Sequence, residues 1–556
     1  MLQDSSHRSD TILQSSNTVP TIMAGTTQTR NMKHHLSSLL FVLCVLGIAK
    51  QSECYKILAI VPTPSYSHQI PYRRLWLELH KRGHEVVLAT SDPIPNIKSP
   101  NFTQIDISQS YGIIKKLDFV QMRFEGKRWT YFIEEEMLPM SKVFAETVFN
   151  STELRKLYAP DSNATFDVFL TEFLYLPSTC AFAHRFNIPI IGLSSLGLVG
   201  FNEHALGGLI LPSHEYTWEM EDNTGTNLSF FKRLCNFVTM WRTIYYIYHE
   251  MVPQHQKLAE EYFGPLPPLL DLLKNVSMLF VNQADVMTPA RPKLANMITF
   301  TASHIERIPK ALPKDLQAFL DGATNGFIYF SLGSNAKSAT LPLEIRRMFC
   351  DVFAKLPYRV VWKFEEDFPG KPDNVYIGKW LPQQSILAHP NIKLFIYQGG
   401  LQSSEETVHY GVPVLGFAIL ADQDYQVARM EALGIGKYLE ITTLKKDELE
   451  NAITELITNK KYKERILYIR NVVRDTPYDP VENLAWWTEY VIRTKGAPHL
   501  RSSLAFQPWY QRCDMDIVVF LTIVIFLIAS TSLHLIAKIL VYIHKNIKST
   551  EKQKIS

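Results

Sequence analysis

A strand, a helix and a second strand follow one another early in this chain, and this pattern restricts its fold more than any other feature. Residues 55–62 and 84–90 are short apolar runs, and apolar side chains recur between them at helical spacing up to Gly83. Two strands joined through a helix are parallel, with a right-handed crossover. Strands expected at residues 166–171 and 188–193 would extend the same sheet.

A second series of the same kind follows. The helical pattern of residues 203–263 is interrupted by the proline-rich residues 264–270, and a strand at residues 278–281 opens the new series. Further strands are expected at residues 327–332, 359–364, 374–377, 392–397 and 412–416, with helices at residues 342–355, from Ser403 and at residues 423–433. The economical architecture is two successive doubly wound α/β domains.

Charge and cysteine content limit the functional classes. The 556 residues include 57 Lys and Arg against 54 Asp and Glu, so the basic excess that is typical of nucleic-acid binders is missing. The six cysteines include no CxxC pair, which disfavours a zinc site and a disulfide scaffold. One or two disulfides stay open, and their pairing cannot be derived from the sequence.

Apolar residues 36–49 follow a short basic segment and are too few for a membrane span, so they predict a secretory signal peptide. A membrane anchor at this end is the alternative. The preceding residues are polar and aperiodic, which suggests that translation begins at Met32.

Residues 517–537 are long and apolar enough to cross a bilayer, and five lysines with one acidic residue follow them. The excess of positive charge predicts a cytosolic tail and places residues 55–516 on the luminal side. The last five residues, KQKIS, resemble a dilysine retrieval signal, with a plain solvated lysine tail as the alternative. We therefore expect a single-pass type I protein of the endoplasmic reticulum membrane. All five N-glycosylation sequons agree with this orientation: Asn101, Asn150, Asn163, Asn227 and Asn275.

These features divide the chain into six expected parts. They are an extension with signal peptide (1–54), a first Rossmann-like domain (55–285), a second one (286–480), a C-terminal helix with a membrane-proximal segment (481–516), a transmembrane helix (517–537) and a basic tail (538–556).

Candidate catalytic residues lie where strands of the first domain end. Ligands of open parallel sheets bind beyond the carboxyl ends of the strands. His68 follows the first strand and Glu172 follows another strand of the same sheet, so the two predict a general base with a carboxylate that orients it. The alternative is an unconnected surface histidine and glutamate.

Two strand-to-helix turns of the second domain, Gly333-Ser334 and Gly399-Gly400, are candidate anion sites. Small residues let the backbone approach a ligand, and free N–H groups at a helix start favour an anion. A structural alternative exists for the second turn. Ser403 and Glu406 match the S-x-x-E capping box, which would stabilise the helix by about 1 kcal/mol.

A set of residue types at fixed spacing between Trp380 and Gln423 resembles the signature of the UDP-glycosyltransferases. The set comprises Trp380-Leu381-Pro382-Gln383, His389, Gly399-Gly400, Ser403, Glu406, Gly411-Val412-Pro413 and Asp422-Gln423. Residues 330–334 (FSLGS), 360–365 (VVWKFE) and Arg291-Pro292 agree with this resemblance, which covers nearly the whole chain from Tyr55. It implies an α/β protein of the GT-B fold, with two Rossmann-like domains facing across a cleft and a C-terminal transmembrane helix.

The resemblance also implies roles for individual residues in nucleotide binding. Trp380 would stack on the uracil, with Gln383 beside the same base, and Glu406 would accept hydrogen bonds from the ribose. Several groups would hold the diphosphate, with Arg291 as their charge partner: Ser334, Ser403, Gln398 and the N–H groups around Gly400.

Asp422 and Gln423 would bind the sugar hydroxyls. His68 would deprotonate the acceptor, paired with Glu172. The implied reaction is a single displacement that inverts the anomeric carbon. The resemblance also implies that no metal is needed. No cofactor is expected either, because the UDP-sugar is a co-substrate.

Two positions depart from the common family pattern. Many members have histidine where this chain has Gln398, whose amide can donate to phosphate but carries no charge. Vertebrate members usually have aspartate where this chain has Glu172, whose carboxylate reaches one methylene further. We interpret Gln398 as a trait of the insect-like subgroup, and we expect donor binding to survive with less charge assistance.

The sequence thus predicts a membrane-anchored transferase that attaches a hexose, expected to be glucose, to small lipophilic hydroxyl compounds, as in detoxification. The expected partners are UDP-glucose or another UDP-hexose, lipophilic acceptors and the lipid bilayer, without nucleic acid, and homo-oligomers stay open. One alternative is a catalytically inactive binding protein of the same fold. A glycosidase is a second alternative, but nothing singles out the two opposed carboxylates it would need.

Overall fold

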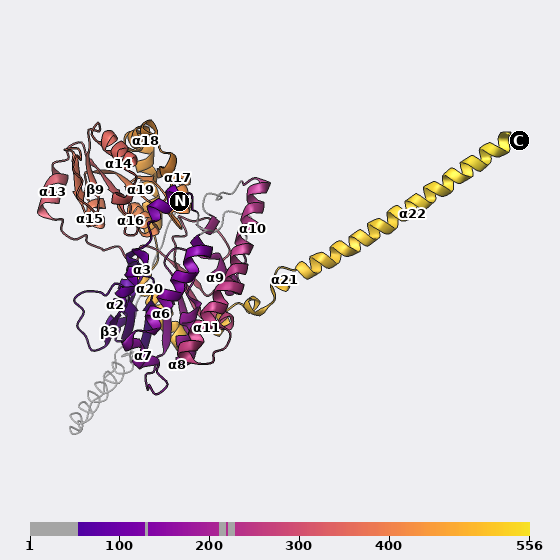
Figure 1. Cartoon of the computed structure of the whole chain (residues 1–556), viewed down its shortest axis with the longest axis horizontal. Coiled ribbons are helices and arrows are strands. Elements are labelled where there is room, and N and C mark those ends of the chain that lie inside the picture. Colours follow the sequence, from indigo (N-terminus) through magenta and orange to yellow (C-terminus); the bar gives the residue numbers. More distant parts are fainter. Residues whose placement is uncertain (1–53, 128–131, 211–217, 221–227, 556) are drawn as a thin grey trace, which may run out of the picture. The chain divides into compact units, whose positions relative to one another are not determined.

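The computed structural model describes residues 54–127, 132–210, 218–220 and 228–555, so the signal peptide predicted at residues 36–49 lies outside the described part. Two parallel β-sheets with flanking helices make up the globular part (Figure 1). Both expected α/β units are therefore confirmed.

The first sheet contains seven parallel strands within the described residues, in the order β3-β2-β1-β4-β5-β6-β7. Central strands such as β1 are almost continuously apolar because helices cover both faces of a parallel sheet. The strands are β1 (Lys56–Val61), β2 (Glu85–Thr90), β3 (Phe102–Asp106), β4 (Val168–Glu172), β5 (Ile190–Ser194), β6 (Met278–Asn282) and β7 (Met297–Phe300).

The strand at residues 278–281 was predicted to open the second series, and this is wrong. It forms β6, which pairs with β5 in the first sheet, and β7 then pairs with β6. The first sheet thus extends beyond residue 285, where the boundary was expected. The helices between its strands are α2 (Tyr66–Lys81), α3 (Tyr111–Ile114), α4 (Phe119–Phe124), α6 (Leu138–Phe149), α7 (Thr152–Tyr158), α8 (Ala181–Phe186), α9 (Gly200–Ala205), α10 (Phe230–Tyr246), α11 (Val252–Phe263) and α12 (Leu269–Lys274).

The second sheet contains six parallel strands within the described residues, in the order β10-β9-β8-β11-β12-β13. They are β8 (Phe327–Ser331), β9 (Arg359–Lys363), β10 (Val375–Gly378), β11 (Ile392–Tyr397), β12 (Val414–Gly416) and β13 (Gly436–Tyr438). The accompanying helices are α13 (Lys314–Asp321), α14 (Leu343–Phe353), α15 (Gln383–Leu387), α16 (Leu401–Tyr410), α17 (Gln423–Ala432), α18 (Lys446–Thr458) and α19 (Lys460–Arg474).

After the second sheet the chain returns to the first. Helix α20 (Pro480–Arg493) buries Leu484, Ala485 and Val491 in the same apolar cluster as side chains of α2 and β4. Arg82 and the buried His84 both contact Glu489 of α20, at 3.2 Å each. The first domain is therefore completed by a segment that follows the second domain in the sequence.

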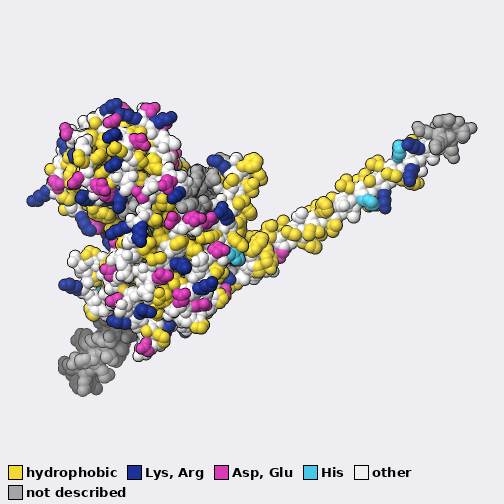
Figure 2. Space-filling view, in the orientation of Figure 1, with side chains coloured by type: hydrophobic (Ala, Val, Ile, Leu, Met, Phe, Trp, Pro, Cys, Tyr) yellow, Lys and Arg dark blue, Asp and Glu magenta, His cyan; other side chains and the backbone are white. Residues whose placement is uncertain are grey.

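The chain ends in α21 (Trp509–Arg512) and the long helix α22 (Met515–Ile555), yellow in Figure 1. Apolar side chains cover much of α22, with lysines toward its C-terminal end (Figure 2). Residues Met515–Ser549 have a mean hydropathy of 2.4 at the most apolar window and none of that window is buried, so this helix is compatible with a membrane anchor. The five cysteines in the described part are all free.

Candidate active site

The site lies where the strand order of each sheet reverses. In the first sheet this point falls between β1 and β4, and in the second between β8 and β11. The segment carrying His68 follows β1, and Glu172 ends β4. The glycine turn at residues 333–334 follows β8, and the turn at residues 398–400 follows β11. Ligands of open α/β sheets bind at such switch points. In each domain, the candidate residues therefore lie at the edge of the sheet where a ligand is expected.

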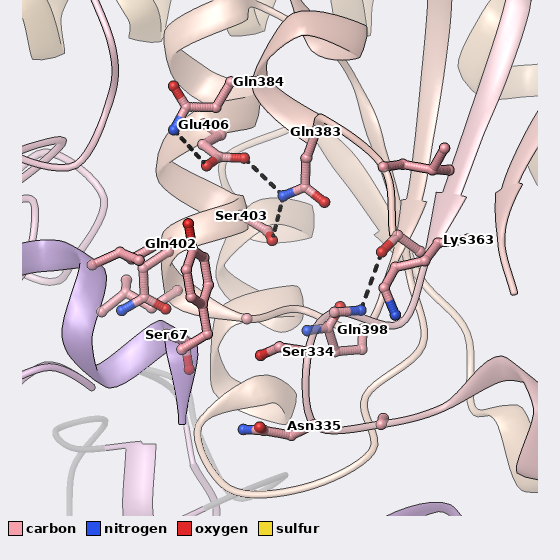
Figure 3. Close-up of a pocket in the computed structure, with 18 of the residues that line it drawn as sticks. Ser67, Ser334, Asn335, Lys363, Gln383, Gln384, Gln398, Gln402, Ser403 and Glu406 are labelled. Carbon is pink, nitrogen blue, oxygen red and sulfur yellow. Dashed lines mark hydrogen bonds between the residues drawn. The ribbon is translucent and has the colours of Figure 1, made fainter. Parts of the chain in front are cut away.

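A cavity of about 550 Å³ is lined by residues from both domains. This volume suits a ligand of several hundred daltons. Figure 3 shows side chains of α15, α16 and the turn after β8 around this space, with Ser67 of α2 opposite them. Of the twelve predicted site residues, ten line the cavity: His68, Ser334, Trp380, Gln383, Gln398, Gly400, Ser403, Glu406, Asp422 and Gln423.

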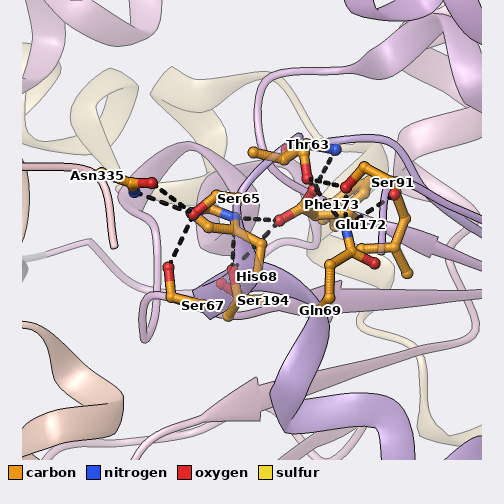
Figure 4. A network of polar contacts seen from close by, with 12 residues as sticks. Thr63, Ser65, Ser67, His68, Gln69, Ser91, Glu172, Phe173, Ser194 and Asn335 are labelled. Carbon is orange, nitrogen blue, oxygen red and sulfur yellow. Dashed lines mark hydrogen bonds and ion pairs between the residues drawn. The ribbon is translucent and has the colours of Figure 1, made fainter. Parts of the chain in front are cut away.

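His68 lies on the first turn of α2 (Figure 4), and its side chain is almost fully buried. Its Nδ1 is 2.5 Å from Oε1 of Glu172 and 2.9 Å from the hydroxyl of Ser195. The backbone N–H of Thr63 donates to the other oxygen of Glu172 at 3.3 Å. Glu172 reaches the cavity only through His68, because its own side chain does not line it. The predicted pair is thus formed, and the contact at Nδ1 leaves Nε2 for a ligand.

Glu406 belongs to a hydrogen-bonded cluster on α15 and α16. Gln383 donates from its Nε2 to Oε2 of Glu406 at 2.7 Å and to the hydroxyl of Ser403 at 2.9 Å. Gln384 donates to the other Glu406 oxygen at 3.1 Å. This places two amides and a carboxylate side by side at the cavity wall, as Figure 3 shows.

The capping-box alternative for this turn is wrong. Helix α16 begins at Leu401, and its N-cap is Gly400, which has no side-chain cap. Ser403 is therefore the third residue of the helix and Glu406 the sixth. The N–H groups of the first turn consequently remain available for an acceptor other than a capping side chain.

Gln398 packs between the two glycine turns. A Cβ at Gly333 would lie 2.1 Å from Nε2 of Gln398, and Gly333 has φ +79°, so only glycine fits there. The Gln398 side chain is buried, yet its Oε1 has no hydrogen-bond partner in the described part of the chain. A buried polar atom without a partner at a cavity wall points to a ligand.

Asp422 is the most perturbed acid of the cavity. Burial raises its pKa to about 7, although the nearby His68 lowers it. Its Oδ2 finds no hydrogen-bond partner among the described residues. The neighbouring Gln423 accepts from the N–H groups of Ile419 and Leu420 through Oε1, at 2.9 and 3.0 Å, which fixes the loop before α17.

Trp380 stands at the cavity rim, with 63% of its surface exposed. Its ring meets the ring of Tyr66 edge to face at 5.6 Å between centroids. Tyr66 opens α2 in the first domain, so the two aromatic side chains close the rim from opposite sides. Nζ of Lys363 lies 5.8 Å from the centroid of the same indole, and the exposed part of the ring is available for stacking.

Arg291 was predicted to partner the diphosphate, and the structure does not place it in the cavity. Its guanidinium pairs with the buried carboxylate of Glu203 in α9. Burial raises the pKa of Glu203, and the charge of Arg291 counteracts that shift. The two charges compensate each other away from the cavity, so we do not carry Arg291 into the donor site.

Several site residues had no clear sequence signal. Ser195 joins the His68 pair, and Asn335 hydrogen-bonds Ser65 across the domains at 3.0 Å. Arg123 of α4 holds Asp424 of α17 through two hydrogen bonds of 2.9 Å each. These contacts join residues that are far apart in sequence. Gln384 is the exception, because it follows Gln383 in the signature, and its position there could have predicted a place in the site.

Two Rossmann-type sheets whose switch points share one cavity are the arrangement of the GT-B fold. Solved structures agree on the fold. The chain resembles the calicheamicin glycosyltransferase CalG4 with a TM-score of 0.54 at 17% identity, over 80% of this chain and 100% of that one. It resembles the glycosyltransferase VinC with a TM-score of 0.53 at 17% identity, over 79% and 100%.

The family model for UDP-glucuronosyl and UDP-glucosyl transferases matches residues 56–554, and the chain belongs to this family. It is 33% identical to UDP-glycosyltransferase UGT5 of Dactylopius coccus, covering 85% of this chain and 89% of that protein. Identity to UDP-glucosyltransferase 2 of the same species is 30%, over 84% and 90%. Human UDP-glucuronosyltransferase 1A5 is 28% identical over 88% and 92%. The chain is thus a UDP-glycosyltransferase, as the resemblance of its motifs predicted.

Proposed function

We propose that this enzyme transfers glucose from UDP-glucose to a hydroxyl group of a small lipophilic acceptor, with inversion at the anomeric carbon. One observation carries the proposal. His68 contacts Glu172 through Nδ1 and lines the same cavity as the uncapped start of α16. A base and an anion site thus share one space of a size that suits both substrates.

The nucleoside would bind along α15 and α16. Trp380 offers an exposed ring face for the uracil, with Gln383 next to it. The ribose hydroxyls would donate to Glu406, whose carboxylate already accepts from Gln383 and Gln384. Those amides hold the carboxylate in place before the donor arrives, which reduces the cost of ordering it.

The diphosphate would lie against the first turn of α16. The N–H groups after Gly400 and the hydroxyl groups of Ser334 and Ser403 are donors, and the helix dipole favours negative charge there. The amide of Gln398 adds a donor without a charge. These donors would stabilise the charge that develops on the diphosphate as it leaves.

Three observations support glucose as the sugar. Asp422 and Gln423 offer an acceptor and donors to sugar hydroxyls. The buried lysine of the cavity wall, Lys363, is paired with Glu365 at 2.6 Å, so it is not left to compensate a sugar carboxylate. The 30% identity to a UDP-glucosyltransferase points the same way.

Apolar side chains of the first domain support a lipophilic acceptor, because Ile70, Phe119 and Leu196 line the cavity near His68. In the reaction, Nε2 of His68 takes the proton of the acceptor hydroxyl. The acceptor oxygen forms a bond to the anomeric carbon while the bond from that carbon to the diphosphate oxygen breaks. UDP leaves with the electron pair, and Glu172 stabilises the imidazolium. We propose that no metal or cofactor takes part.

The proposed location follows from α22. We place the enzyme in the endoplasmic reticulum membrane, with both sheets on the luminal side and a short cytosolic tail, because the lysines lie beyond the apolar part of the helix. Protease protection of the two domains in sealed microsomes tests this orientation, and cleavage of the domains without detergent would contradict it.

The test of the function compares the full chain in membranes with its His68→Ala variant. Both are incubated with UDP-glucose and a panel of simple phenols, and UDP and conjugates are measured by mass spectrometry. We expect acceptor-dependent UDP release that the variant lacks. Release that persists in the variant would refute His68 as the base. UDP-glucose binding without any conjugate, for every acceptor and UDP-sugar tried, would favour the alternative of an inactive binding protein.

A further inference from the structure

A buried histidine joins the two domains at the back of the donor site. His304 lies in the segment between β7 of the first sheet and α13 of the second domain, and only 2% of its side chain is exposed. Its Nε2 is 3.3 Å from Oε1 of Glu406, and its Nδ1 is 3.5 Å from Oε2 of Glu405. One imidazole ring thus faces two consecutive carboxylates of α16.

The charge state of this cluster follows from its surroundings. Burial alone lowers the pKa of His304, but the close contact with Glu406 and the charges of Glu406 and Glu405 outweigh it and raise that pKa. His409, on the same helix, does not supply the cation, because burial and nearby positive groups lower its pKa to about 4. Burial raises the pKa of Glu405, and His304 counteracts that effect. With one ring nitrogen 3.3 Å from Glu406 and the other 3.5 Å from Glu405, His304 is placed to supply the cation for this buried acidic pair.

The same segment is tied to both domains. On the first-domain side, the hydroxyl of Ser303 donates to the carbonyl of Pro71 in α2 at 2.6 Å, and Arg74 of α2 donates to the carbonyl of Ser303 at 3.2 Å. On the second-domain side, Thr301 donates to Oε1 of Glu405 at 2.6 Å.

Gln384 adds a further tie, because it accepts from the N–H of Glu306 at 2.9 Å. Through its Nε2 it also donates to Glu406. The segment therefore connects α2, which carries His68, to α16, which carries Glu406.

We infer that His304 is a positioning residue for the donor site. Its positive charge holds the Glu406 carboxylate toward the ribose and offsets the repulsion between Glu406 and Glu405. This inference rests on the proposed role of Glu406 in donor binding. Neutral substitution of His304 leaves two buried carboxylates without their cation, and the Glu406 side chain then moves or takes up a proton. Either change weakens the hydrogen bonds from the ribose.

The experiment measures UDP binding by calorimetry with the full chain in detergent micelles. His304→Gln is the test variant. His389→Gln is the matched control, because His389 is equally buried but pairs with Asp321, outside the cavity. We expect the Kd for UDP to rise at least about tenfold in His304→Gln, and to stay within about twofold in the control. An unchanged Kd in a folded His304→Gln protein overturns the inference, whereas a wild-type chain that does not bind UDP overturns the proposed donor site instead.

A second comparison separates charge compensation from a packing effect. In His304→Gln with Glu405→Gln, the repelling carboxylate is gone, so we expect UDP affinity between those of His304→Gln and wild type. If His304→Gln does not fold, this double variant carries the test, and wild-type affinity in it overturns the inference. In turnover assays, the KM for the UDP-sugar should rise with little change in kcat or in the KM for the acceptor. If kcat falls and both KM values rise by similar factors, His304 has only a structural role, and the inference is overturned.

Discussion

Nδ1 of His68 lies 2.5 Å from Oε1 of Glu172, although 104 residues separate the two in sequence. Strands β1 and β4 are neighbours in the sheet, with Ile60 paired to Thr171, so the last residue of β4 and the residues that follow β1 meet at one edge. The longer reach of glutamate compared with aspartate is therefore accommodated in this chain.

The first prediction concerns this contact between His68 and Glu172. Glu172→Gln should lower kcat by a factor of about 10² to 10⁴, because the amide no longer stabilises the imidazolium or fixes its tautomer. The Kd for UDP should not change, since Glu172 does not line the cavity. Asp167→Asn is the control, because Asp167 precedes the same strand at the opposite end and accepts from the N–H of Lys56. Steady-state kinetics with UDP calorimetry check both statements, and a kcat near wild type in Glu172→Gln would contradict them.

The second prediction concerns pH and Asp422, whose pKa burial raises to about 7. Sugar hydroxyls donate to the ionised carboxylate, so the UDP-sugar binds the charged form better. Affinity for the UDP-sugar should therefore rise as pH increases toward 7 and level off above it. Below pH 7 it should fall by up to about tenfold per pH unit.

The check is the ratio of the Kd for UDP-glucose to the Kd for UDP between pH 5.5 and 8.5, which isolates the sugar. Asp422→Asn should make this ratio independent of pH. A wild-type ratio that is flat across the range contradicts the assigned role of Asp422.

Gln398 gives the third prediction. Gln398→His would introduce a side chain that is charged below a pKa of about 6.5. We expect UDP to bind the variant more tightly at pH 5.5 than at pH 8, because the imidazolium attracts the diphosphate. The wild-type chain should lack this difference for UDP. Equal pH dependence in the two proteins would place the diphosphate away from residue 398.

The fourth prediction tests the contact of Arg123 with the second domain. Besides its two hydrogen bonds to Asp424, this guanidinium pairs with Glu440 at 2.5 Å. Arg123→Ala leaves two partly buried carboxylates without a cation, and should lower the free energy of unfolding by about 3 kcal/mol. Lys127→Ala, which removes a more exposed pair with Glu125, should change it by less than about 1 kcal/mol. Chemical denaturation of the full chain in detergent measures both, and a similar small effect of the two substitutions would refute a stabilising role for Arg123.

Most strands could be predicted from short continuous apolar runs, because parallel strands that are buried on both faces are apolar without interruption. β11 coincides with the expected residues 392–397. Strand β3 was missed, since it lies at the sheet edge and only two of its five side chains are buried. Periodicity also could not show which sheet β6 joins, because this depends on tertiary pairing.

The site was predictable where the chemistry is local to a turn and not where it depends on packing. The spacing between Trp380 and Gln423 identified most residues of the cavity wall. The S-x-x-E pattern favoured Ser403 as the N-cap, but the turn at Gly399, whose φ is +92°, starts the helix earlier, and the N-cap is Gly400, three residues before Ser403. Arg291 and His304 have partners 88 and about 100 residues away, and no sequence rule at either position indicates such a partner.

The return of α20 to the first domain has a consequence for synthesis on the ribosome. Leu484, Ala485 and Val491 cover part of one face of the first sheet, yet they are made after the whole second domain. While residues 301–480 are synthesised, this apolar face of the first sheet stays exposed to solvent. The first domain is therefore an incomplete folding intermediate during that time. The second domain is thus an insertion into the first as far as assembly is concerned, and the nascent chain needs protection from aggregation until its last globular helix has left the exit tunnel.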